Sequence, residues 1–102
     1  MNAVGAVFYV LIFIGIAMAQ DDYCGTCRKM IIELREEFND DFQKVSIQRI
    51  VDALNGECKI EMPGFPGQIC KSKVNANACK LLRILRKGAT NEQACKALQF
   101  CN

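Results

Sequence analysis

Histidine is absent from the 102-residue chain, and serine occurs only as Ser46 and Ser72. Serine and cysteine nucleophiles usually depend on a histidine base, and the common zinc sites combine cysteine with histidine. Neither serine lies in a G-x-S-x-G elbow, and the chain contains no glycine-rich phosphate-binding loop. The sequence therefore predicts a protein that is not an enzyme and that has no metal site and no cofactor.

Charged side chains are absent from residues 1–19. Residues 4–18 form an apolar run that ends in small residues around Met18, and the polar stretch 20–22 follows at once. This order is typical of a secretory signal peptide cleaved after Ala19. No lysine or arginine precedes the run; the alternative is a membrane anchor, although the run is short of the roughly 20 residues that a spanning helix needs. We expect a signal peptide over 1–19, one mature domain over 20–102, and secretion.

Seven cysteines follow this apolar run. A domain of this size buries only about 60% of its unfolded surface, so covalent links are expected to stabilise it. An exported protein meets an oxidising environment, in which cysteines form disulfides. The odd number leaves one cysteine over.

Strand patterns are absent as well, and four helical segments are predicted. Apolar residues at steps of three and four indicate a helix over 24–42. A second helix begins at the N-cap residue Ser46 and runs to about Leu54, where Asn55-Gly56 weakens it. Residues 62–67 hold both prolines and predict a loop, followed by a third helix over 70–87. The capping box of residues 90–93 opens a fourth helix that continues to about residue 100.

The closely spaced pair Cys24 and Cys27 permits three interpretations. A redox dithiol would follow a strand in a βαβ unit, and no strand is predicted. Half of a zinc site would need a second such pair or histidines. We therefore expect each of these cysteines to bond to a distant partner, although spacing alone leaves many connectivities open.

The cysteine framework and the helix pattern together resemble the saposin-like (saposin B-type) family, which includes saposins, NK-lysin, granulysin, amoebapores and caenopores. The resemblance covers essentially the whole mature chain, and amoebapores and caenopores share its single-domain organisation. It implies an all-α, compact fold of four to five helices stapled by three disulfides. The pairs that it implies are Cys24–Cys101, Cys27–Cys95 and Cys58–Cys70.

Cys79 is the cysteine that this pairing leaves over. It lies nine residues after Cys70 on the same predicted helix, so the two side chains point to opposite sides and Cys79 is expected to face outward. One interpretation is a half-buried thiol that acts as a small apolar side chain. The other is a homodimer linked through Cys79.

Charge is divided unequally along the mature chain. Residues 21–61 carry a net charge of −4, whereas residues 62–102 carry +6 with a single acid. The basic residues are either a solubilising surface or a contact for anionic lipid headgroups. No aromatic residue interleaves them, which argues against nucleic acid as the partner. Six candidates for the headgroup contact lie on or near the third predicted helix: Lys71, Lys73, Lys80, Arg83, Arg86 and Lys87.

The resemblance implies that the helices cover one another when closed and offer their apolar faces to lipid when opened. We expect a secreted protein that binds and perturbs anionic phospholipid bilayers, with a pore-forming or antimicrobial role in innate immunity or in the digestion of microbes. The main alternative is a lipid-binding or lipid-transfer module that assists a hydrolase. A third is a stable secreted interaction domain without membrane activity.

A pH trigger would have to use carboxylates, because histidine is absent. Four of them crowd the predicted C-terminal end of the first helix, where the helix terminus and like charges raise carboxyl pKa values. The alternative is an ordinary solvated helix end. Such a trigger would suit delivery to an acidic vesicular or gut compartment. These helix-end carboxylates are Glu36, Glu37, Asp40 and Asp41.

Overall fold

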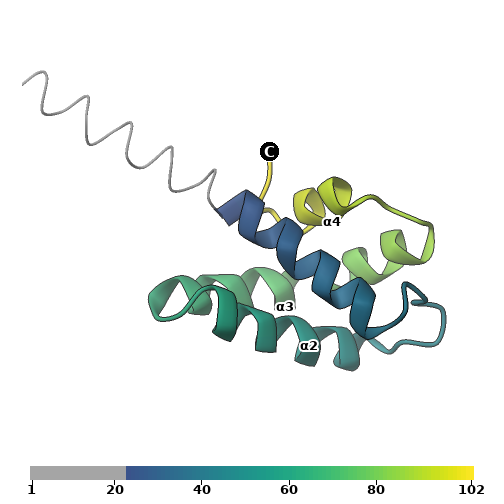
Figure 1. Ribbon diagram of the computed structural model, residues 1–102, viewed down its shortest axis with the longest axis horizontal. Coiled ribbons are helices and arrows are strands. Elements are labelled where there is room, and N and C mark those ends of the chain that lie inside the picture. The colour runs from purple at the N-terminus through teal and green to yellow at the C-terminus, as the bar shows by residue number, and fades with distance from the viewer. Residues whose placement is uncertain (1–22) are drawn as a thin grey trace, which may run out of the picture.

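A computed structural model describes residues 23–102, so the predicted signal peptide and its cleavage site lie outside the described residues. Within this range the protein consists of helices without strands. The first helix spans residues 23–37. It is followed by α2 (Ile47–Glu61), α3 (Phe65–Arg86) and α4 (Asn91–Ala97), as Figure 1 shows. The predicted all-α class, stapled by three disulfides, is confirmed.

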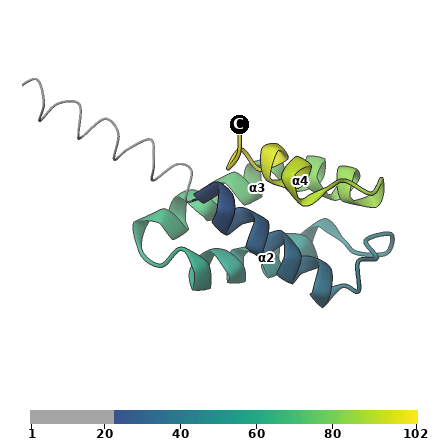
Figure 2. The ribbon, with the colours of Figure 1, turned by 45° about the horizontal axis from the view of Figure 1, so that its top comes forward.

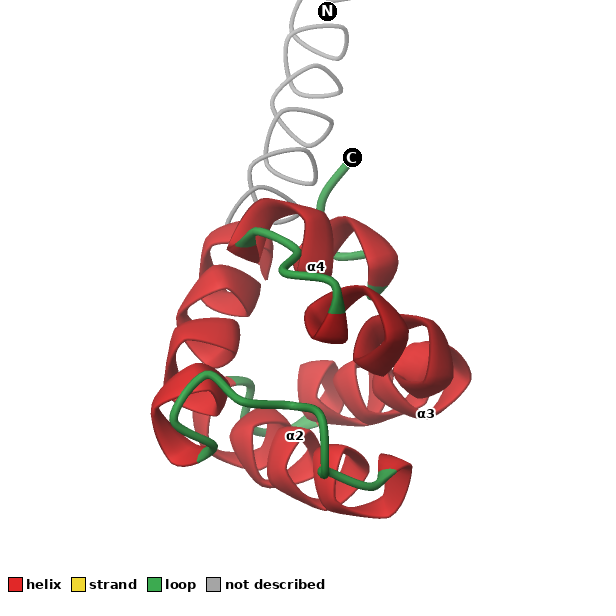
Figure 3. Ribbon diagram, turned by 90° about the vertical axis from the view of Figure 1, so that its right-hand side faces the viewer, coloured by secondary structure: helices red, strands yellow, loops and turns green. Residues whose placement is uncertain are grey.

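The four helices surround one apolar core. Seen from the end that carries the loops 38–46 and 87–90, the first helix, α4, α3 and α2 follow one another around the core (Figure 3). Each large side chain buried there stabilises the fold by about 1.5–3 kcal/mol. The largest wholly buried side chains come from the first helix, α2, α3 and the residue that follows α4: Met30, Ile31, Leu34, Ile50, Leu54, Leu81 and Leu98.

Three disulfides divide these helices into two covalently linked pairs. Cys24–Cys101 and Cys27–Cys95 join the first helix to the C-terminal segment and to α4, and Figures 1 and 2 show the C-terminus beside the start of the first helix. The third disulfide, Cys58–Cys70, joins α2 to α3 with a Cα–Cα distance of 5.6 Å. These are the pairs that the resemblance implies. Among residues 23–102, no disulfide connects one pair of helices to the other.

We call the first helix, α4 and residues 98–102 the terminal half, and α2 with α3 the hairpin half. Hydrogen bonds and packing, rather than disulfides, hold the two halves together. Lys29 Nζ lies 3.1 Å from Glu61 Oε2, and Lys73 Nζ donates to the Gln99 carbonyl oxygen at 2.8 Å. The loop between α3 and α4 is tied to the first helix, because Arg35 donates to the Ala89 carbonyl oxygen and to Asn91 Oδ1.

The first helix ends at residue 37, five residues before the predicted end. Asn39 and Asp40 both take a φ of 54°, a left-handed conformation that a continuing helix cannot contain. Asp40 is held by Arg35, whose NH1 lies 2.7 Å from Asp40 Oδ1. Phe42 is nevertheless 2% exposed, because the chain turns back and packs it on the core. The apolar spacing therefore indicated correctly that Phe42 is buried, but the prediction that the helix continues to residue 42 was wrong.

The start of α2 agrees with the prediction, whereas its end does not. Ser46 is the N-cap, and its hydroxyl accepts a hydrogen bond from the Arg49 N–H at 3.2 Å. The helix continues through Asn55-Gly56 to Glu61. Cys58 lies beyond that weak point, is wholly buried and is bonded to α3, so tertiary packing overrides the local preference.

The start of α3 also differs from the prediction, because residues 65–67 of the predicted loop form its first turn. Pro66 is compatible with this position, since the first turn of a helix does not use its N–H groups within the helix. Gly67 lies so close to Met62 that a Cβ there would overlap the Met62 carbonyl oxygen. At the other end, Gly88 takes a φ of 85° just beyond the helix, as expected for a C-terminal glycine.

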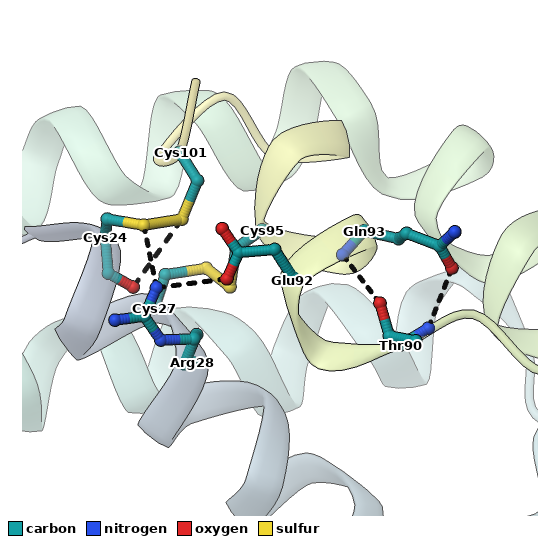
Figure 4. Close-up of polar contacts among 8 residues, drawn as sticks. All are labelled: Cys24, Cys27, Arg28, Thr90, Glu92, Gln93, Cys95 and Cys101. Atoms are coloured by element: carbon teal, nitrogen blue, oxygen red, sulfur yellow. Dashed lines mark hydrogen bonds and ion pairs between the residues drawn. A yellow bond between two sulfur atoms is a disulfide. The ribbon is translucent and has the colours of Figure 1, made fainter.

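The capping box that begins α4 is present as predicted. The Gln93 N–H donates to Thr90 Oγ1 at 3.1 Å, and the Thr90 N–H donates to Gln93 Oε1 at 2.9 Å (Figure 4). The helix ends at Ala97 rather than near Phe100. Gln99 takes a φ of 66°, which turns the chain back toward Cys24.

Candidate functional site: basic face, hairpin tip and seam carboxylates

Two of the six predicted headgroup contacts are engaged within the fold. Lys73 Nζ donates to the Gln99 carbonyl oxygen and lies 4.6 Å from the centre of the Phe100 ring. Arg86 donates from Nε to the Phe42 carbonyl oxygen at 3.1 Å and from NH2 to that of Val45 at 3.0 Å. Lys73 thus anchors the C-terminal segment, and Arg86 anchors the loop between the first helix and α2.

The other four basic side chains are open to a partner. Lys80, Arg83 and Lys87 are exposed and Lys71 is half-buried. None of them forms a hydrogen bond or an ion pair with another residue of the described range. No acidic residue lies between Glu61 and Glu92 in the sequence, so this part of α3 contributes no neutralising charge of its own. We call Lys71, Lys80, Arg83 and Lys87 the basic face.

Cys79 adjoins this basic face. It is a free cysteine and is exposed, as its helical position predicts, while Cys70 on the opposite side of α3 is wholly buried. The thiol is therefore accessible to a second copy of the chain or to a small reagent. The homodimer through Cys79 stays a prediction.

Exposed apolar side chains gather at the turn between α2 and α3. Ile60 is 71% exposed, Phe65 is 76% exposed and Ile69 is 45% exposed. None of the three was predicted as a site residue, and Phe65 falls in the predicted loop 62–67. A signal was present: Ile60 follows Lys59 and falls off the stripe of buried residues Ile50, Leu54 and Cys58.

Two lysines flank this turn. Lys59 and Lys71 line one depression of about 190 Å³ together with Gly64 and Gly67. Lys59 stands on the last turn of α2 and Lys71 on the second turn of α3, so the depression brings the two helices' charges to one place. Neither ammonium group is neutralised by an ion pair with a described residue. We call residues 59–71 the hairpin tip.

Three carboxylates meet where the first helix packs against α2. Oxygens of Glu33, Glu57 and Glu61 lie within 4.8 Å of one another, and we call these the seam carboxylates. Lys29 donates to Glu61 at 3.1 Å, and this hydrogen bond raises the pKa of Lys29. One oxygen of Glu57, Oε2, is buried and accepts no hydrogen bond from the described residues.

Burial raises the pKa of Glu57 from its ordinary value of 4.5 to about 7, and a hydrogen bond with Glu33 and repulsion by Glu33, Glu61 and Glu37 add to this effect. The Glu57 carboxyl group therefore titrates near neutrality, although the pKa of an unperturbed glutamate is about 4. Nothing local in the sequence distinguishes Glu57 from a solvated glutamate, so it is not among the predicted acid-sensing residues. Its environment is created by the first helix, more than twenty residues away in the chain.

The four predicted acid-sensing carboxylates differ from one another in their surroundings. Glu36 and Glu37 are exposed on the last turn of the first helix. Asp40 lies beyond the helix end and pairs with Arg35, and Asp41 accepts a hydrogen bond from the Gln43 N–H at 3.2 Å. The helix-end carboxylates therefore do not form a single cluster of like charge, and their role as a pH trigger stays a prediction.

Two groups of side chains have the composition of a cation site. In one of them, Cys24 and Cys101 are bonded to each other, and Arg28 NH1 lies 3.1 Å from both Cys24 Sγ and Glu92 Oε2 (Figure 4). A disulfide offers no thiolate, and the guanidinium already supplies positive charge there. The seam carboxylates are the other group, and Lys29 already supplies a cation to it.

Among the described helices, none has both the length and the apolar character that crossing a membrane requires. Comparisons with protein-family models, with curated proteins and with solved structures found no match. The features of this chain that bear on its function are therefore the disulfide framework, the basic face and the exposed apolar side chains.

Proposed function

We propose that the protein is a secreted saposin-like protein that binds anionic lipid bilayers and disturbs their packing, with permeabilisation of microbial membranes as its role. The observation that carries the proposal is the basic face. Each basic side chain near an anionic surface contributes about 1 kcal/mol to binding, so four unneutralised side chains account for about 4 kcal/mol. That free energy corresponds to roughly a thousandfold gain in affinity for anionic over neutral bilayers.

The disulfide framework supports the second part of the proposal, the disturbance of lipid packing. Each half of the molecule is stapled internally, and no described disulfide joins the terminal half to the hairpin half. The halves can therefore separate without breaking a covalent bond. Separation would expose the apolar side chains that line the core, and a bilayer is the solvent that would accept them.

The seam carboxylates support such an opening. With Glu57 ionised, three negative charges face a single ammonium group at the contact between the first helix and α2. Like charges in a partly buried contact oppose its closure. The contact that must break during opening is thus weakened at pH values above the pKa of Glu57.

Leakage of a dye from vesicles tests the proposal. The full mature protein is added to vesicles of neutral lipid and to vesicles that contain anionic phosphatidylglycerol, and binding and dye release are recorded. We expect binding and release with the anionic vesicles only. Extraction of lipid without dye release would favour the lipid-transfer alternative, and absence of binding to either vesicle would contradict both.

A pair of variants with equal net charge locates the contact. Lys80→Gln combined with Arg83→Gln removes two charges from the basic face, whereas Lys44→Gln combined with Lys96→Gln removes two exposed charges elsewhere. The first variant is expected to bind anionic vesicles about thirtyfold less tightly, and the control only slightly less tightly. Equal losses in the two variants would mean that net charge, and not the basic face, determines binding.

A further inference from the structure

The two most exposed large apolar side chains of the described residues, Ile60 and Phe65, lie on either side of the turn between α2 and α3. Ile69 stands one turn of helix beyond Phe65 and is also exposed. Single exposed apolar residues are ordinary on protein surfaces, whereas several gathered at one projecting point indicate an interaction site. In Figures 1 and 2 this turn is the end of the molecule opposite the loops 38–46 and 87–90.

The base beneath these side chains is firmly held, so their exposure does not come from a loose loop. Cys58 and Cys70 are both wholly buried and bonded to each other directly behind the turn. Met62 is 3% exposed and fills the inside of the turn. Gly67 leaves no room for a Cβ against the Met62 carbonyl oxygen. A fixed turn of this kind presents Ile60, Phe65 and Ile69 outward whether or not a partner is bound.

The backbone of the turn is also suited to an environment poor in water. A peptide N–H that enters a bilayer without a hydrogen-bond partner is costly. Pro63 and Pro66 have no N–H to satisfy. The Met62 N–H donates to the Cys58 carbonyl oxygen at 3.0 Å, and the Gly67 N–H donates to that of Gly64 at 3.1 Å. Four of the six residues 62–67 therefore bring no unpaired donor with them.

The charges around the tip specify the partner. Lys59 and Lys71 line one depression at the same turn, next to Ile60 and two residues from Ile69 in the sequence. Their ammonium groups form no ion pair with a described residue. The nearest acid along the chain, Glu61, is bonded to Lys29 of the first helix. An apolar point bordered by cations complements a bilayer whose headgroups are anionic and whose interior is apolar. A second copy of the same tip would bring lysines against lysines.

We propose that the hairpin tip is the part of the molecule that enters an anionic bilayer, with Ile60, Phe65 and Ile69 in the interface and Lys59 and Lys71 at the headgroup phosphates. The inference rests on the proposed function: the basic face attracts the molecule to the anionic bilayer, and the hairpin tip is the part that enters it. The hairpin half enters first, and the terminal half remains outside the lipid until the molecule opens.

A tryptophan reporter tests this orientation, since the chain contains no tryptophan of its own. In the full mature protein, Phe65→Trp places the fluorophore at the tip, and Ile47→Trp places it at the opposite end of α2, where Ile47 is 44% exposed. With phosphatidylglycerol vesicles that contain brominated lipid, we expect a blue shift and quenching for Phe65→Trp and neither for Ile47→Trp. Quenching of Ile47→Trp alone, or of both variants equally, overturns the proposed orientation.

Binding measurements separate the two proposals. The parent is expected to bind the vesicles, and the combined Ile60→Ser, Phe65→Ser and Ile69→Ser variant is expected to bind about a hundredfold less tightly, while keeping its helical circular dichroism. The matched control, Ile32→Ser with Ile47→Ser, removes exposed apolar side chains elsewhere and is expected to bind like the parent. If the parent and the tip variant bind the vesicles equally, the proposed role of the hairpin tip is overturned and the proposed function stands. If the parent does not bind, the proposed function is overturned as well. A blue shift of Phe65→Trp that grows with protein concentration without lipid assigns the tip to a second copy and overturns the bilayer contact.

Discussion

Replacement of Glu57 by glutamine is expected to stabilise the protein at high pH and to leave it unchanged at low pH. Glu57 lies at the contact between the first helix and α2, with one oxygen buried and without a hydrogen-bond partner among the described residues. Glu33 and Glu61 are its close carboxylate neighbours, and Lys29 is ion-paired with Glu61. Glutamine has the same shape and carries no charge, so the variant removes the ionisation without removing the side chain.

The direction of the effect follows from the raised pKa. In the folded protein Glu57 holds its proton up to about pH 7, whereas in the unfolded chain it loses the proton near its ordinary pKa of 4.5. Between these values the folded state binds more protons than the unfolded state, so the free energy of unfolding falls as the pH rises. Below pH 4.5 both states are protonated and the effect vanishes. This is the reverse of the usual behaviour of an ion-paired carboxylate.

The magnitude is bounded by the size of the shift. A change in pKa from 4.5 to about 7 corresponds to about 3 kcal/mol once the pH exceeds both values. Glu57 is only half-buried, and water screens part of the repulsion, so a gain of about 1–2 kcal/mol is expected for Glu57→Gln at pH 8. In a domain of this size that gain raises the Tm by roughly 5–15 °C.

Denaturant titrations of the oxidised parent and variant at several pH values between 4 and 8 measure this effect. The difference between the two proteins is the informative quantity, because the carboxylates that do not interact with Glu57 contribute equally to both. Glu36→Gln, an exposed change on the first helix, is the matched control and is expected to shift stability by less than about 0.5 kcal/mol at every pH. A carboxyl-carbon NMR titration follows the pKa of Glu57 directly. Equal stability of parent and Glu57→Gln at pH 8 would refute the reasoning.

Gly67→Ala is expected to lower the free energy of unfolding by about 2 kcal/mol in denaturant titrations, because the added Cβ overlaps the Met62 carbonyl oxygen. The control Gly56→Ala has free space in α2 and is expected to stabilise by about 0.5–1 kcal/mol; a loss there, or no loss at Gly67, would contradict the packing. Cys79→Ser is expected to abolish any dimer band on non-reducing gels, and a parent that is already monomeric excludes the disulfide-linked dimer. Replacement of the helix-end carboxylates by amides is expected to give strong binding to anionic vesicles at neutral pH, and an unchanged pH profile would identify them as a solvated helix end.

Under the proposed function, the seam carboxylates and the helix-end carboxylates are expected to affect different steps, and acid is expected to act on these steps in opposite ways. Protonation of the helix-end carboxylates removes repulsion between the protein and anionic lipid, which favours approach. Protonation of Glu57 removes repulsion between the two halves, which favours the closed molecule. We therefore expect acid to strengthen binding and to slow opening. Vesicle binding and dye release, measured side by side from pH 4.5 to 8, distinguish these two steps.

The sequence by itself determined the helical class and several helix ends, because the signals for these features act over a few residues. Ser46 and Thr90 each cap the helix that follows, and in both cases the bond spans three residues. Gly88 ends α3 through its own backbone freedom. Spacing alone left the disulfide connectivity open, and the expected pairs came from the family resemblance. Cys79 faces outward because the turn of a helix alone determines its direction from Cys70.

Only the tertiary structure decided which charged and apolar side chains are available. Lys73 and Lys80 look alike in the sequence, yet the carbonyl oxygen that binds Lys73 comes from Gln99, 26 residues later. Burial raises the pKa of Glu57, and Glu33 on another helix adds to this effect. Ile60 and Phe65 are of residue types usually found in a core, but both are exposed. They lie at the turn that the buried Cys58–Cys70 disulfide holds in place. Each of these outcomes depends on groups that are distant in the chain and close in space, and local pattern contains no information about such contacts.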